Sequence, residues 1–454
     1  MCTPTWGARV SAVTVIGTGG RETGGDGGRP ASRPRAAAEP ATVDGLFAHA
    51  AARRPGEVAV VDGGRPLTYG AAQQNASRLA SVMLRYGVQL GDPVLVHTAD
   101  HAQSLVAQLA VLALGGVCVP VPDPAGERER ARIAEMSGAT LVLCSGVHRE
   151  RWPLDAMVLD DARTWARIAP VRVDGSLPRS GPDDVAYLLT ERADDGGCVG
   201  HLVDHRAWLL ATGARLRRAG RPGRGVWTGQ RPGGARGLAA LWWAVSAGSR
   251  LNGPVAPATG RDHAGAAAVY GPEEYAEFLA GSRHGAPAGP GTALVIGGAL
   301  PAGLVERHRD VLPYTRLLAE FSPRDGAMPW TAVDCTSAGG SGGSGAGSAV
   351  PRVRVTVRDE EGRPLPAGGT GQIWAAGTAL PFDRLCDGCR EPAVGHRGSL
   401  TYSGYLGRWD GDGTLEITGR AAPRTPPGSA RTTPALACAA HGPAHRPHPM
   451  PTRA

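Results

Sequence analysis

Residues 186–209 read AYLLTERADDGGCVGHLVDHRAWL and carry the strongest fold signal in the chain. The apolar run Val185 to Leu189 predicts a buried strand. The segment from Glu191 to Gly200 contains glycines and predicts a loop, after which a helix is expected to start at Asp204. A strand, a glycine loop and a helix in this order are typical of phosphate-binding sites, because loop amides can point at an anion.

The expected loop is acidic, which opposes that use. Glu191, Asp194 and Asp195 place three carboxylates in it, and close like charges repel by roughly 1 to 4 kcal/mol per pair, depending on the local dielectric. Asp194 and Asp195 could hold a cation such as magnesium, although solvation of an exposed loop is the better explanation. Cys198 could be a nucleophile near a helix start, where thiol pKa values fall, but no paired base is identifiable.

The composition excludes several kinds of chemistry. All 48 basic residues of the 454-residue chain are arginines, so no Schiff base and no lysine phosphate clamp can form. The net charge of +7 is spread along the chain without a basic stripe interleaved with aromatics, which argues against nucleic-acid binding. No apolar run is long enough to span a membrane. The eight scattered cysteines favour a reducing cytoplasm.

Strand and helix patterns alternate through the first third of the chain. Such alternation predicts a largely parallel sheet covered by helices on both faces. Strands are expected at residues 57–61, 93–97, 117–121 and 140–144, and helices at 71–86, 101–114 and 127–136.

Several motifs together resemble one known family. Residues 186–205 are similar to its phosphate-loop phrase, and LAVLALGGVCVPVPDP (109–124) to the motif before it. LVIGGALP (294–301), RLLAEFSPRD (316–325) and DGTLEITGR (412–420) follow in the family's order. Between about residues 43 and 420, the chain therefore resembles the adenylate-forming (AMP-binding) superfamily, and within it the adenylation domains of nonribosomal peptide synthetases.

The resemblance implies an α/β fold and a domain order. The large domain would hold two helix-covered, largely parallel sheets, and a small β-barrel subdomain would follow it. The expected segments are a disordered N-terminus (1–40), an adenylation-like core (41–334), a Gly/Ser linker (335–350), a β-barrel-like subdomain (351–420) and a disordered Pro/Arg/His tail (421–454).

The resemblance also implies ATP and Mg²⁺ as cofactors. Asp325 matches the acid that holds magnesium. The positions that match nucleotide-binding residues, as a remnant of such a site, are Gly196, Gly200, Gly298, Phe321, Arg324 and Arg420.

The chain departs from the family pattern at positions that carry its chemistry. Tyr405 replaces the aspartate that would grip the ribose hydroxyls, and Ala422 replaces the hinge aspartate. No acid lies between Gly220 and Thr259 to pair with a substrate ammonium, and helix packing explains Trp242 and Trp243 there. Only 34 residues follow position 420 (454 − 420), so the C-terminal subdomain with its catalytic lysine is expected to be missing.

A zinc site is a weaker alternative. Cys386, Cys389 and His396 could supply three ligands, and Cys335 or Cys438 a fourth. An ordinary surface insert explains the same residues, so zinc is not expected.

Three functions remain open from the sequence. The first is a degenerate, catalytically impaired adenylation-domain homologue that acts by binding in natural-product biosynthesis, with a carrier protein or another assembly-line protein as partner. The second is an active but atypical ATP-dependent ligase that adenylates an acyl or aminoacyl substrate. The third is a non-functional remnant.

Overall fold

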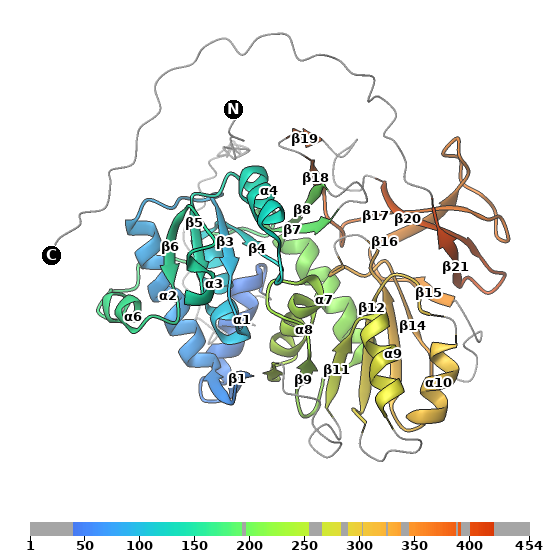
Figure 1. The fold of residues 1–454 in the computed structure, drawn as a ribbon, viewed down its shortest axis with the longest axis horizontal. Helices are drawn as coiled ribbons and strands as arrows, with labels where there is room; N and C mark the ends of the chain where they lie inside the picture. Colours follow the sequence, from blue (N-terminus) through green and yellow to red (C-terminus); the bar gives the residue numbers. More distant parts are fainter. Residues whose placement is uncertain are drawn as a thin grey trace, which may run out of the picture. The chain divides into compact units, whose positions relative to one another are not determined.

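The computed structural model describes residues 40–192, 197–253, 266–282, 289–301, 303–323, 326–336, 345–386, 389–391 and 400–421. The chain divides into two compact units, Met1–Ala421 and Ala422–Ala454, and every described residue lies in the first. Two sheets and the helices packed on them make up the described part (Figure 1). The expected α/β class is confirmed. The N-terminal and C-terminal segments expected to be disordered lie almost wholly outside the described residues.

The smaller sheet has the strand order β19-β18-β8-β7-β4-β3-β5-β6. Strands β7, β4, β3, β5 and β6 run parallel, and β8 pairs antiparallel with β7. The strands span β3 (Pro93–His97), β4 (Val117–Pro120), β5 (Leu141–Cys144), β6 (Asp155–Val158), β7 (Val185–Arg192), β8 (Cys198–Asp204), β18 (Asp383–Cys386) and β19 (Cys389–Glu391).

The larger sheet has the order β16-β17-β20-β21-β15-β14-β13-β12-β11-β9-β10-β1-β2. It is parallel from β13 to β1, and antiparallel strands extend it beyond β13 into the region expected to be the small subdomain. The strands span β1 (Val58–Asp62), β2 (Arg65–Thr68), β9 (Val226–Thr228), β10 (Leu251–Asn252), β11 (Ala267–Tyr270), β12 (Thr292–Gly297), β13 (Arg316–Phe321), β14 (Thr331–Asp334), β15 (Gly345–Ala349), β16 (Val353–Arg358), β17 (Gly371–Gly377), β20 (Thr401–Trp409) and β21 (Leu415–Arg420).

The helices pack against these sheets and against each other. Helix α3 contacts β1 of the larger sheet as well as β3 and β4 of the smaller one. Its residues are buried almost all round, which is expected of a helix enclosed on every side. The helices span α1 (Val43–Arg53), α2 (Tyr69–Arg85), α3 (His101–Leu114), α4 (Glu127–Ser137), α5 (Gly146–Arg149), α6 (Ala162–Ile168), α7 (His205–Ala219), α8 (Ala235–Ser246), α9 (Pro272–Gly281) and α10 (Leu304–Val311).

Within the described residues, no helix combines the length and the apolar character needed to cross a bilayer.

The expected loop from Glu191 to Gly200 is wrong at both ends. β7 continues to Arg192 and β8 begins at Cys198, and these two residues are paired in the hairpin. β18 pairs with the other edge of β8. A buried backbone must satisfy its hydrogen bonds, and pairing on both sides does so for β8. The helix start is confirmed, because the Asp204 carboxylate caps α7 by accepting from the Ala207 amide at 2.6 Å.

The expected Gly/Ser linker at 335–350 ends in a strand. β15 lies between β14 and β21, and the Thr331 hydroxyl donates to the Ala346 carbonyl at 2.6 Å. Gly347 has φ +77°, and a Cβ there would lie 2.2 Å from the Ala332 carbonyl oxygen. Small residues are therefore required at this strand by close packing, not only by flexibility.

Candidate functional site

Three of the residues expected to bind a nucleotide lie around one side chain, Tyr405. Gly298 directly follows β12, Phe321 ends β13 and Arg420 ends β21. Tyr405 lies on β20 and is paired with Arg420 in the β20–β21 ladder. Strands β15 and β14 separate β21 from β13 in the sheet order, so it is the contacts of Tyr405 with Phe321 and Gly298 that bring β20 against the ends of β12 and β13.

The Tyr405 ring fills the space between these residues. It packs edge-on against Phe321 with ring centroids 5.4 Å apart, and the Arg420 guanidinium carbon lies 5.3 Å from its ring centre. A Cβ added to Gly298 would lie only 2.1 Å from the Tyr405 hydroxyl. Tyr405 itself is 9% exposed, and its amide donates to the Ser403 hydroxyl at 2.9 Å. The ring is therefore held in place from several sides.

The remaining cavity beside this ring is very small. Its volume is about 10 Å³, which is room for about one water molecule. A cavity of this size does not hold a nucleotide, and no chemical step through ATP or Mg²⁺ follows from it. Its lining residues are Gly298, Leu300, Ala319, Glu320, Phe321, Gly345, Ala346 and Ile417.

The other expected site residues do not join this group. Gly200 lies in β8 of the smaller sheet, where an added Cβ would be 2.6 Å from Leu188 Cδ1. Its backbone is flanked by Thr190 and Leu385 in the two neighbouring strands, so Gly200 has a packing role. Gly196, Arg324 and Asp325 lie outside the described residues, as do Asp194, Asp195, His396, Ala422 and Cys438.

The structure also places the cysteine expected as a possible nucleophile, the two tryptophans expected to pack in a helix and two of the possible zinc ligands. Cys198 is buried in β8 rather than placed in a loop near a helix start. Trp242 and Trp243 are both fully buried in α8, as helix packing requires. Cys386 and Cys389 are paired across the β18–β19 hairpin, but their side chains lie outside the description.

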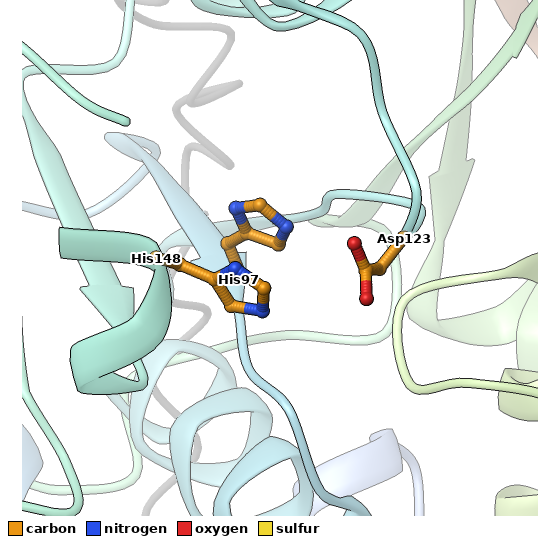
Figure 2. Close-up of side chains that lie close together, drawn as sticks. All are labelled: His97, Asp123 and His148. Carbon is orange, nitrogen blue, oxygen red and sulfur yellow. The ribbon is translucent and has the colours of Figure 1, made fainter. Parts of the chain in front are cut away.

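A second group of polar side chains was missed by the sequence interpretation. His97, Asp123 and His148 lie together, with their possible ligand atoms all within 4.8 Å of one another (Figure 2). Each follows or ends one of three neighbouring parallel strands, β3, β4 and β5. That placement was the available signal, because the carboxyl ends of parallel strands commonly hold ligands.

Comparison with known proteins identifies the architecture. A family model described as AMP-binding enzyme matches residues 47–189. Phosphinothricin tripeptide synthetase PhsC of Streptomyces viridochromogenes is 28% identical over 410 residues, which cover 84% of this chain. The chain belongs to the adenylate-forming superfamily. This superfamily member spans only 36% of the length of that synthetase.

Solved structures show the same fold. The AMPPNP-bound form of the nonribosomal peptide synthetase FmoA3 has a TM-score of 0.71 at 21% identity, covering 84% of this chain and 43% of that one. An artificially fused adenylation–PCP di-domain, NpsA-ThdA of Klebsiella oxytoca, has a TM-score of 0.70 at 18% identity, covering 84% and 79%. At these identities the likeness concerns the fold of the adenylate-forming domain alone.

Proposed function

We propose that this chain is an adenylation-domain homologue of natural-product biosynthesis that is catalytically impaired and acts by binding. The observation that carries the proposal is Tyr405. Its ring lies against Phe321 and Arg420, and its hydroxyl occupies the space next to Gly298. These are the positions where the family resemblance puts the nucleotide, so the chain's own side chain takes that place.

The absence of lysine supports the same proposal. Adenylation develops negative charge on phosphate, and removing one donor that stabilises such charge costs about 100- to 1000-fold in rate. The chain has no lysine to supply such a donor, and Tyr405 stands where the ribose-binding acid would be. Several losses together predict little or no turnover.

An active atypical ATP-dependent acyl- or aminoacyl-adenylating ligase is the second candidate. Phe321 keeps an aromatic ring at the end of β13, and Arg420 keeps a cation at the end of β21. The FmoA3 neighbour was solved with AMPPNP bound, which supports ATP use in this fold. This candidate requires Tyr405 to swing out of the site.

A carrier protein is the proposed partner, and the cytoplasm is the proposed location. The matched relative is a tripeptide synthetase, and one structural neighbour is an adenylation domain fused to a carrier domain. The described core is well packed around α3 and both sheets, which argues for a folded binding protein over a non-functional remnant.

Replacing Tyr405 with aspartate is expected to create Mg·ATP binding. The smaller carboxylate would vacate the space beside Gly298 and offer acceptors to ribose hydroxyls. Calorimetry on the full chain should detect no binding to the wild type at millimolar Mg·ATP. Affinity should be raised at least about tenfold in Tyr405→Asp, which is about 1.4 kcal/mol.

Tyr405→Phe is the matched control, because it keeps the ring in the site and should not bind. Circular dichroism establishes that each variant is folded. Micromolar Mg·ATP binding by the wild type would overturn the proposal and favour the ligase, which a panel of carboxylic acids in a pyrophosphate-exchange assay would then examine.

A further inference from the structure

The cluster of His97, Asp123 and His148 lies at the point where the strand order of the smaller sheet reverses. β3 connects through α3 to β4 on one side of it, whereas β5, its neighbour on the other side, connects onward to β6. Loops that leave two adjacent strands in opposite directions open a crevice at their carboxyl ends, and ligands commonly bind there. His97 ends β3, and His148 lies in α5, directly after β5. The cluster therefore lies at this switch point.

The hydrogen bonding of His97 determines what it can bind. The Trp152 indole N–H donates to His97 Nδ1 at 3.0 Å. An indole nitrogen can only donate, so Nδ1 must be the unprotonated nitrogen. Burial, followed by the charges of His148, Arg151 and Arg130, lowers the pKa of His97 to about 3, so the ring is neutral at pH 7. Its hydrogen is therefore on Nε2.

This tautomer makes His97 unsuitable as a metal ligand. A metal ion needs a lone pair on the nitrogen it contacts, and a ligating histidine usually donates from its other nitrogen. In His97, Nε2 carries the hydrogen and has no free lone pair, and Nδ1 accepts a hydrogen bond instead of donating one. The His97 and His148 rings are also stacked 3.8 Å apart at an angle of 5° (Figure 2). A cation between two parallel rings cannot lie in the plane of both, where the lone pairs point.

Several buried polar atoms in and beside the cluster have no hydrogen-bond partner. Among the described residues, His97 Nε2, both ring nitrogens of His148 and Arg130 Nε are buried without a partner. His97 and His148 are 0% and 3% exposed. His97 Nε2 and Arg130 Nε are donors, and an unpaired buried donor costs free energy. An acceptor is what would satisfy them.

Positive charge surrounds the same place. Arg231 and Arg151 approach the Asp123 carboxylate at 3.3 Å and 3.7 Å and are 62% and 42% exposed. Arg130, from α4, contributes to lowering the pKa of both histidines. Two exposed guanidinium groups thus pair with the Asp123 carboxylate and form the solvent side of the cluster, and Arg130 adds a third positive charge near the histidines while one of its nitrogens donates to the Ala125 carbonyl at 2.6 Å.

We propose that this cluster binds a small oxyanion, a carboxylate or a phosphate. His97 Nε2–H and Arg130 Nε–H donate from the buried side, and Arg151 and Arg231 bind from the solvent side. Arginine is well suited to such anions because its planar fork matches their oxygens. The site is separate from the Tyr405 pocket and goes beyond the proposed binding function of the chain.

Imidazole ¹H–¹⁵N spectra of the full chain, labelled in histidine and assigned with His97→Gln, test the proposal. His97 should show the Nε2–H tautomer. Inorganic phosphate or acetate, added at constant ionic strength, should shift the His97 and His148 signals, and comparing the two anions distinguishes phosphate from carboxylate. Arg130→Gln should weaken that binding at least about tenfold. Arg206→Gln, on an exposed arginine paired with Asp183, should leave it unchanged.

Three outcomes would overturn the proposal. One is a His97 ring protonated on Nδ1, and another is the absence of any shift with both anions. The third is micromolar binding of Zn²⁺ that is lost in His148→Gln, which would make the cluster a metal site.

Discussion

Glu320→Ala is expected to lower the free energy of unfolding by about 3 to 5 kcal/mol, because it leaves a buried guanidinium without its counter-charge. Glu320 on β13 and Arg215 on α7 have side chains only 4% and 2% exposed. Arg215 Nη2 donates to Glu320 Oε2 at 2.7 Å, and Arg215 Nε donates to the same oxygen at 3.0 Å. Arg215 also donates to the Ala327 carbonyl at 2.9 Å, an interaction too small to offset a buried charge.

Urea denaturation followed by circular dichroism measures this change. The double variant Arg215→Met/Glu320→Met removes both charges, so it should recover most of the loss. Arg206→Ala breaks the exposed ion pair with Asp183 and should cost no more than about 1 kcal/mol. A loss below about 1 kcal/mol in Glu320→Ala would show that the buried pair is not needed, contrary to the expected cost of an unpaired charge.

Much of the smaller sheet could be predicted from the sequence. The expected strand 93–97 and helix 101–114 coincide with β3 and α3, because a short apolar run and a long apolar helix are each marked by local pattern. Asp100 adds a cap by accepting from the Gln103 amide at 2.7 Å. Where the local pattern and the tertiary packing agree, the sequence alone is sufficient to predict the helix or strand.

The failures come from tertiary contacts that no local pattern records. Pairing on both edges draws Cys198 to Gly200 into β8, although the segment has the composition of a loop. The resemblance identified Tyr405 as a replacement for an acid, but not that its ring would fill the site beside Gly298. The histidine cluster joins the end of β3, the segment after β4 and helix α5, and only the strand order brings them together.

The chain is also expected to lose stability steeply in acid, because several histidines are buried in neutral form. Burial is the main cause that lowers each of their pKa values, and for His97 the value falls from 6.5 to about 3. The unfolded chain therefore takes up protons at a higher pH than the folded chain. The stabilisation is fully present above pH 6.5 and is lost progressively as the pH falls toward 3. The histidines with lowered pKa values are His97, His101, His148, His205 and His308.

The slope of the free energy of unfolding against pH distinguishes the contribution of His97 from that of the other buried histidines. Each such histidine changes the free energy of unfolding by up to about 1.4 kcal/mol per pH unit. For His97, whose pKa falls from 6.5 to about 3, the total change over that range is roughly 5 kcal/mol. His97→Gln cannot protonate, while its amide oxygen can still accept from the Trp152 N–H. Urea titrations at successive pH values should therefore give a shallower slope for His97→Gln than for the wild type. His49→Gln, at an exposed position of α1, should follow the wild type. Parallel wild-type and His97→Gln curves would mean that His97 is not held neutral by the fold, and the tautomer on which the oxyanion site depends would lose its basis.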